Sequence, residues 1–219
     1  MVEISTSILS IKKEESTKKF YDLELAHTDY FHIDVMDGEF VENDTSKIMQ
    51  EYAELIKQIS NIPLDVHLMV KDIKKYVEEY IVLEPNIITF HYEALQDANE
   101  ISKIVKYIKQ NNIKVGIAIK PNTKLEEIYS ILPYVHMVLI MTVEPGKGGQ
   151  KLILDTIEKI KELKQYTIEN NIDIDIEADG GINLDTVAYV KEAGADMIVA
   201  GSAITGSDNY AEVVEKLKK

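Results

Sequence analysis

Residues 31 to 36 read FHIDVM, and this stretch has the two-residue period of a β-strand. Successive side chains of an extended chain point to opposite faces, so the odd-numbered residues form one wholly apolar face. His32, Asp34 and Met36 lie together on the other face. A buried histidine or carboxylate needs a partner, because an unpaired buried charge is costly. The stretch therefore predicts an inner strand that carries polar groups into the protein.

Seven further apolar runs of strand character surround this one in the sequence, and segments of helical period alternate with them. The eight strand candidates are ISTSIL from Ile4, YFHIDVMD from Tyr30, LDVHLMV from Leu64, IITFHYE from Ile87, KVGIAIK from Lys114, MVLIMTVE from Met137, IDIEAD from Ile174 and MIVAGSAI from Met197. Helical spacing of three and four joins Ile101, Ile104, Val105 and Ile108, then Leu125, Ile128 and Leu132, then Ile157, Ile160 and Leu163.

This alternation predicts parallel strands joined by helical crossovers. Two architectures fit: a closed (β/α)₈ TIM barrel or an open, doubly wound sheet. We expect an α/β protein with a single (β/α)₈ barrel domain over residues 1–219. Such barrels usually have about 250 residues, so the loops here must be short.

Composition excludes several classes of partner. The net charge of -14 argues against nucleic acid, because phosphate contacts need clustered basic residues. The chain has no arginine, so an anion site must use lysine or backbone amides, and no cysteine, so thiolate metal sites are excluded. The N-terminus lacks the pattern of a signal peptide, and no apolar stretch reaches the roughly 20 residues of a membrane span. We expect a soluble cytoplasmic protein that binds neither nucleic acid nor membrane.

Histidines and carboxylates gather where the predicted strands end, which is where (β/α)₈ barrels hold their reactive groups. His32 and Asp34 end the second strand, His67 the third and Asp179 the seventh. Two imidazoles and two carboxylates suit Zn²⁺, or Fe²⁺ or Mn²⁺ with further oxygen ligands. A single buried histidine is more often structural, but four such residues at matching strand ends favour a metal site.

Glycine-rich segments follow the last three strands: EPGKGGQ at 144–150, DGG at 179–181 and GS at 201–202. Backbone amides freed by glycine can surround a phosphate, and barrels often hold phosphate in these late loops. Any one segment alone would be an ordinary turn, whereas three together favour a phosphate site. The candidate residues are Gly146, Lys147, Gly148, Gly149, Gly180, Gly181, Gly201 and Ser202.

Three methionines and one serine complete the candidate site. Methionine is usually core filler, but Met36, Met69 and Met141 lie at strand ends, where they could form a dry surface over a reacting centre. Ser7, near the end of the first strand, could donate a hydrogen bond to a substrate hydroxyl. We predict that these four residues and His67 contact the substrate.

Seven motifs occur in order along almost the whole chain: SILS at 7–10, HIDVMDGEFVEN at 32–43, DVHLMV at 65–70, TFHYEA at 89–94, EPGKGGQ at 144–150, EADGGIN at 177–183 and AGSAI at 200–204. Together they resemble the motifs of the ribulose-phosphate 3-epimerase family. The paired HxDxMDG and DxHLMV motifs are the specific part. The resemblance implies a (β/α)₈ barrel that binds one divalent metal ion per subunit, with Zn²⁺ favoured over Fe²⁺, Mn²⁺ or Co²⁺. The ligands would be His32, Asp34, His67 and Asp179.

The same resemblance implies that Asp34 and Asp179 are the acid/base pair of an isomerase of the pentose phosphate pathway, acting as a homo-oligomer, dimer or hexamer. Inverting C3 of a ketose phosphate requires one carboxylate to remove a proton from one face while the other returns a proton to the opposite face. A metal-stabilised enediolate would link the two steps. We assign Asp34 as proton acceptor for D-ribulose 5-phosphate and Asp179 as donor towards D-xylulose 5-phosphate.

Three alternatives stay open at the level of sequence. Glu42, Glu144 and Lys147 depart from the usual family pattern, so D-allulose 6-phosphate is a second candidate substrate. A hexulose-phosphate synthase or decarboxylase relative would use lysine and Mg²⁺, and Lys120 ends the fifth strand, but the histidine pair fits that chemistry poorly. A non-catalytic phosphosugar-binding barrel would not need two facing carboxylates.

Overall fold

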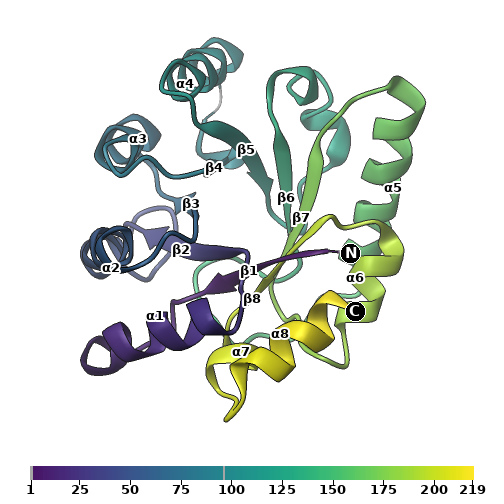
Figure 1. The fold of residues 1–219 in the computed structure, drawn as a ribbon. Coiled ribbons are helices and arrows are strands. Elements are labelled where there is room, and N and C mark those ends of the chain that lie inside the picture. The colour runs from purple at the N-terminus through teal and green to yellow at the C-terminus, as the bar shows by residue number, and fades with distance from the viewer. Residues whose placement is uncertain (1, 96) are drawn as a thin grey trace.

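The computed structural model describes residues 2–95 and 97–219, in which eight strands close into a parallel barrel (Figure 1). Each strand pairs with the next along the chain, and the last pairs with the first. The closed (β/α)₈ barrel is therefore confirmed over the open sheet. The strands are β1 (Glu3–Ser7), β2 (Tyr30–Met36), β3 (Leu64–Met69), β4 (Ile87–His91), β5 (Lys114–Ile119), β6 (Met137–Met141), β7 (Asp175–Asp179) and β8 (Met197–Ala200).

Helices surround the barrel and cover the apolar outer faces of the strands (Figure 1). Phe31, Ile33 and Val35 of β2 are fully buried against this layer, as the alternation in their stretch predicts. Among the described residues, no helix is both long enough and apolar enough to cross a membrane. The α-helices are α1 (Ser16–Leu25), α2 (Ser46–Ile59), α3 (Ile73–Ile81), α4 (Ala98–Gln110), α5 (Asp155–Asn170), α6 (Val187–Ala193), α7 (Ser202–Thr205) and α8 (Tyr210–Lys218).

The prediction of a helix between β5 and β6 is wrong. Two short 3₁₀ turns occupy this connection, η3 (Leu125–Glu127) and η4 (Leu132–Tyr134). Pro133 lacks an amide donor and disfavours helical geometry at the residue before it, so a helix cannot run through this point. The three apolar side chains with helical spacing are still buried, because the 3₁₀ turns direct them to the same core. Two further 3₁₀ turns are η1 (Lys13–Glu15) and η2 (Tyr92–Ala94).

Every strand except β7 ends before its predicted run does, as β1, β6 and β8 illustrate. β1 ends at Ser7, β6 at Met141 and β8 at Ala200. The apolar character continues because Ile8 and Val143, in the loops after β1 and β6, and Ile204, in the short helix α7, are buried. Burial thus extends beyond the last strand hydrogen bonds, and a pattern of hydrophobicity cannot locate that boundary.

The barrel interior is layered, with an apolar layer at the amino ends of the strands and the histidines and carboxylates nearer their carboxyl ends. Tyr30, Ile87, Met137 and Met197 start the even-numbered strands and form an apolar cluster at the amino end. In (β/α)₈ barrels four side chains from alternate strands make each layer. Nearer the carboxyl end, the register places Asp34 beside His67, Met36 beside Met69 and Met141 beside Asp179. The barrel therefore directs the candidate site residues towards one end.

Candidate functional site

A cavity of about 1050 Å³ opens at the carboxyl ends of the strands. Its floor comes from strands β1, β2, β3, β6, β7 and β8, and much of its rim comes from the loops after β6, β7 and β8. Of the predicted substrate- and phosphate-binding residues, only His67 does not line it, because this side chain is fully buried in the barrel. Those that do are Ser7, Met36, Met69, Met141, Gly146, Lys147, Gly148, Gly149, Gly180, Gly181, Gly201 and Ser202.

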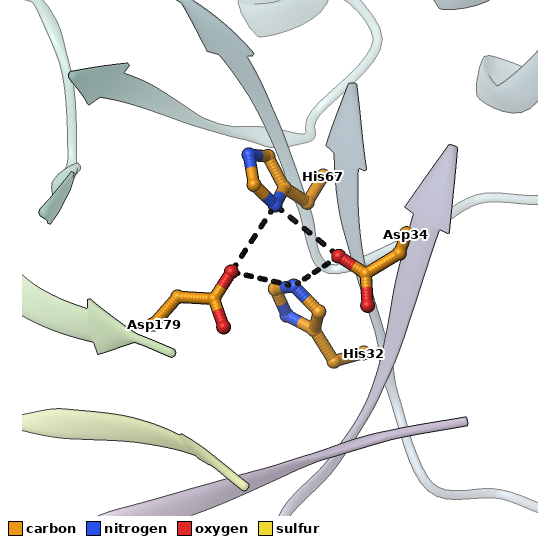
Figure 2. Close-up of side chains that lie close together, drawn as sticks. All are labelled: His32, Asp34, His67 and Asp179. Atoms are coloured by element: carbon orange, nitrogen blue, oxygen red, sulfur yellow. Dashed lines mark ion pairs between the residues drawn. The ribbon is translucent and has the colours of Figure 1, made fainter. Parts of the chain in front are cut away.

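His32, Asp34, His67 and Asp179 point towards one another, as Figure 2 shows, and Asp34 and Asp179 line the floor of this cavity. The His32 Nε2 atom lies 3.4 Å from Asp34 Oδ1 and 3.9 Å from Asp179 Oδ2. The His67 Nδ1 atom lies 3.4 Å from Asp34 Oδ1 and 3.5 Å from Asp179 Oδ2. The four residues grouped from the sequence are therefore brought together by strands β2, β3 and β7.

Spacing and hydrogen bonding both fit a divalent metal ion among these four residues. Zinc binds nitrogen and oxygen at about 2.1 Å, which places two ligands of a tetrahedral ion about 3.4 Å apart. The observed separations of 3.4 to 3.9 Å follow that pattern. His32 Nε2 and His67 Nδ1 are buried, and neither has a hydrogen-bond partner among the described residues. Buried polar atoms are rarely left unsatisfied, so the cluster can hold a cation.

Asp65 orients His32 from below. Its Oδ2 atom lies 2.6 Å from His32 Nδ1 and also accepts a hydrogen bond from Ser5 Oγ at 2.7 Å. A carboxylate only accepts, so the ring carries a proton on Nδ1, and Nε2 is the nitrogen that it turns towards the cluster. Burial opposes a charge on His32, but Asp65 and Asp34 outweigh it and raise its pKa well above the ordinary value. Asp65 was not among the predicted site residues, although its position two residues before His67 marks the same face of β3.

The sequence analysis expected the Ser7 hydroxyl to donate to a substrate in the cavity, but in the structure it donates to Asp34. The hydroxyl donates to Asp34 Oδ2 at 2.7 Å, which leaves Asp34 Oδ1 facing the two histidines. Burial opposes ionisation of Asp34, but His32 and His67 outweigh it and hold its pKa well below the usual range. Asp34 is therefore ionised and held in one orientation.

Glu177 is a buried carboxyl group that the sequence analysis left without a role. It is fully buried on β7 beside Asp65 and His32, with ligand-type atoms of the three residues within 4.8 Å of one another. Burial, then the charge of Asp65, raise the pKa of Glu177 well above its ordinary value. A protonated Glu177 lets the neighbouring Asp65 stay charged and continue to accept from His32.

His91 ends β4 and Glu93 lies in the following turn η2; neither is among the residues described as lining the cavity. The Nε2 atoms of His67 and His91 are 3.0 Å apart, and His91 Nδ1 lies 3.1 Å from Glu93 Oε2. Burial is the main cause that lowers the pKa of His91 to about 4. Burial opposes ionisation of Glu93, but hydrogen bonds led by His91 lower its pKa to about 2. At neutral pH a neutral imidazole therefore lies between His67 and a carboxylate.

The methionines form an apolar rim around the cluster. Met36, Met69 and Met141 are each almost fully buried, yet each lines the cavity. They lie directly beside or beyond the histidines and carboxylates in the strand register. Thioether side chains offer no strong hydrogen bonds to water, so this rim makes the region above the cluster dry.

The late glycines form the part of the rim that was predicted to bind phosphate. Gly181 has a φ of +68°, and a Cβ there would lie 2.3 Å from the backbone nitrogen of Leu152. Only glycine allows this conformation and this close approach of two loops. Asn43 Nδ2 donates to the Gly146 carbonyl at 2.7 Å, which joins the loop after β2 to the loop after β6.

Three threonine hydroxyls, which the sequence analysis did not single out, hold the carbonyl groups of these loops. Thr142 Oγ1 donates to the Gly180 carbonyl at 2.5 Å and Thr186 Oγ1 to the Gly181 carbonyl at 2.9 Å. Thr205 Oγ1 donates to the carbonyl of Gly201 at 3.1 Å. With its carbonyls held by hydroxyls, each loop has fewer free acceptors to repel an anion.

The charged residues that raised alternatives lie outside the cluster. Glu144 and Lys147 line the cavity but are solvent-exposed. Lys120 is not among the residues described as lining the cavity, and its ammonium lies 4.2 Å from the centre of the Phe40 ring. The structure therefore gives no support to a lysine-based centre at this position.

Comparison with known proteins identifies relatives along the full chain. Residues 3–205 match the profile of the ribulose-phosphate 3 epimerase family. The ribulose-phosphate 3-epimerase of Methanocaldococcus jannaschii is 40% identical over 219 residues, which covers 100% of this chain and 91% of that protein. The ribulose-phosphate 3-epimerase of Bacillus subtilis is 35% identical, covering 100% of this chain and 99% of the relative.

Solved structures with the same barrel are more distant in sequence. KGPDC from Streptococcus mutans superposes with a TM-score of 0.74 at 11% identity, covering 100% of this chain and 96% of that chain. The 3-hexulose-6-phosphate synthase of Salmonella typhimurium gives a TM-score of 0.71 at 16% identity, covering 99% and 96%. At such low identity these similarities support the (β/α)₈ fold alone.

Proposed function

The chain belongs to the ribulose-phosphate 3-epimerase family and is an isomerase of that type, and we propose that it interconverts D-ribulose 5-phosphate and D-xylulose 5-phosphate. The observation that carries this proposal is the pair of carboxylates, Asp34 on β2 and Asp179 on β7, which meet with two histidines beneath one cavity. Epimerisation at C3 needs a proton acceptor on one face of the sugar and a donor on the other. Simple binding needs neither.

His32, Asp34, His67 and Asp179 would hold one divalent metal ion per subunit, with Zn²⁺ favoured by two nitrogen and two oxygen donors. When bound, the ion supplies Lewis-acid stabilisation of the negative charge that develops on the sugar oxygens. Asp65 supports this role by fixing the proton of His32 on Nδ1, and it would be a positioning residue.

Asp34 would remove the C3 proton of D-ribulose 5-phosphate, and Asp179 would return a proton to the opposite face through an enediolate. The low pKa of Asp34 keeps it ionised and able to accept, and Ser7 holds its orientation. In the reverse direction the two aspartates exchange roles. The rim of Met36, Met69 and Met141 would limit the access of water to the enediolate.

The phosphate of the substrate would lie at the glycine loops after β6, β7 and β8. Gly180, Gly181 and Gly201 line the cavity there, and their carbonyls are occupied by threonine hydroxyls. With no arginine in the chain, backbone amides and the exposed Lys147 are the groups available for an anion. A phosphate held at this rim would place the ketose carbons towards the aspartates at the floor.

The proposal is tested by proton NMR of the Zn²⁺-loaded protein in D₂O, with D-ribulose 5-phosphate and, in parallel, D-allulose 6-phosphate. We expect deuterium to enter C3 as the epimer appears, with the pentulose reacting faster. Faster reaction of the six-carbon sugar would reassign the substrate. Absence of exchange with both sugars, in folded and metal-loaded protein, would overturn the proposal. Light scattering on the same sample tests the predicted homo-oligomer.

Metal binding should release protons and weaken as the pH falls. The pKa values of His32 and His67 are raised in the metal-free protein, so each ring keeps a second proton to a higher pH than an ordinary histidine does. A metal ion requires the bare nitrogen and must displace that proton. For each proton displaced, we expect the Kd for Zn²⁺ to rise about tenfold when the pH is lowered by one unit. Calorimetry in buffers of different ionisation enthalpy measures the number released, and a value of zero near pH 7 would contradict the prediction.

A further inference from the structure

We infer that Glu93 is a positioning residue that acts through His91 to set the tautomer of His67. The inference rests on the proposed metal site. It adds a residue to which neither the sequence analysis nor the distances within the cluster assign a role. Its basis is a chain of three side chains: Glu93 from η2, His91 from β4 and His67 from β3.

The carboxylate of Glu93 determines the direction of the first hydrogen bond. Its Oε1 atom accepts from the backbone amide of Lys120 at 2.7 Å and from the Thr123 hydroxyl. Its Oε2 atom faces His91 Nδ1 at 3.1 Å. A carboxylate can only accept hydrogen bonds, so the proton between Glu93 and His91 must belong to His91 Nδ1.

This direction is transmitted to His67. A neutral imidazole with its proton on Nδ1 can only accept at Nε2. His91 Nε2 lies 3.0 Å from His67 Nε2, so His67 must supply the proton for this contact. The Nδ1 atom of His67 is then free to offer its lone pair towards Asp34 and Asp179. The opposite tautomer would place a proton where a metal ion has to bind.

The surroundings keep this chain in place. His91 is fully buried. The centre of its ring lies 5.1 Å from the centre of the His67 ring in a stacked arrangement and 4.9 Å from the centre of the Phe40 ring. The loop after β5 donates two hydrogen bonds to the Glu93 carboxylate. This loop is itself anchored, because Lys159 Nζ donates to the carbonyls of Pro121 and Thr123. His32 has its own carboxylate, Asp65, at 2.6 Å. Each of the two histidine ligands therefore has a separate acceptor that fixes its tautomer.

Glu93→Gln is the decisive variant, because it keeps the shape and replaces one oxygen by a donor. The amide of Lys120 cannot reverse its direction, so the glutamine oxygen should face it and the NH₂ group should face His91. His91 would then accept at Nδ1 and donate from Nε2, and His67 would be forced to carry its proton on Nδ1. We expect His91 to switch tautomer and the affinity for Zn²⁺ to fall about 100-fold.

The measurements are the ¹⁵N NMR shifts of the His91 ring, which report which nitrogen is protonated, and Zn²⁺ affinity by competition with a chelator. Thr123→Val is the matched control, since it removes a hydrogen bond to the same carboxylate without adding a donor. It should leave the His91 tautomer unchanged and the Zn²⁺ affinity within about threefold. His91→Phe, which keeps an aromatic ring but removes the acceptor, should weaken Zn²⁺ binding at least tenfold, and provides a second test if Glu93→Gln folds poorly.

Two outcomes would count against the inference, and they can be told apart. If the wild-type protein binds Zn²⁺ and Glu93→Gln binds it equally well with His91 still protonated on Nδ1, the role of Glu93 is overturned and the proposed function stands. If the folded wild-type protein binds no divalent ion, the proposed metal site fails, and this inference fails with it.

Discussion

Replacement of Asp34 by Asn should reduce epimerase turnover by about 10³-fold, because proton transfer by a positioned side chain contributes on the order of 10² to 10⁴-fold. The amide keeps the size of the side chain but cannot accept the C3 proton. It also loses the negative charge that faces His32 and His67 across 3.4 Å. The coupled NMR assay in D₂O described above measures the loss directly.

Asp179→Asn distinguishes a two-carboxylate mechanism from a single-base one. Asp34 would still remove the C3 proton of D-ribulose 5-phosphate and could return a deuteron to the same face. We therefore expect exchange at C3 to persist while epimer formation falls by about 10³-fold. Asp208→Asn, at an exposed carboxylate, should leave both rates unchanged. If exchange and epimerisation fall together in Asp179→Asn that still binds metal, the two-face assignment is wrong.

Gly181→Ala should be the most damaging change in the phosphate loops. The new Cβ would lie 2.3 Å from Leu152 N and 2.7 Å from Leu152 Cα, and these backbone atoms cannot rotate away. The φ of +68° adds strain for any residue with a Cβ. We expect the free energy of unfolding to fall by about 3 kcal/mol or more, and KM for the sugar phosphate to rise because the loops must separate.

Gly149→Ala is a matched control for this effect. Gly149 also has a positive φ, +73°, but a Cβ there would have no neighbour within 4 Å. It should carry only the conformational cost of about 1 kcal/mol. Urea unfolding of both variants measures the difference. Equal losses would show that backbone strain alone matters and that the contact with Leu152 does not.

The structure confirms the predicted barrel, and the prediction succeeded because the same strand pattern occurs eight times in the sequence. Eight apolar runs with polar strand ends report the same architecture, and an error at one element does not change it. The wrong prediction of a helix between β5 and β6 shows the limit of reading structure from periodicity. Leu125, Ile128 and Leu132 are buried as helical spacing predicts, but the connection forms 3₁₀ turns, and Pro133 disfavours a continuous α-helix there. Periodicity reports which side chains face the core more reliably than the helix type that carries them.

The candidate metal cluster could be predicted because parallel strands bring their carboxyl ends together. His32, Asp34, His67 and Asp179 needed only the strand order and the face of each residue. The residues that support them were missed for a different reason. Asp65 and Glu177 look like ordinary inward positions of β3 and β7, and their effect depends on contacts between strands: Asp65 contacts His32 on the neighbouring strand β2, and Glu177 lies near both of them.

The sequence by itself determined the barrel and the four clustered residues, because alternation along each strand decides which side chains point inward. Only the tertiary structure decided how protons are arranged around them. Hydrogen-bond direction depends on separations of a few ångströms between different strands, such as the 3.0 Å between the Nε2 atoms of His67 and His91. Ser7 faces Asp34 instead of the open cavity for the same reason. Period and spacing carry no information at that scale.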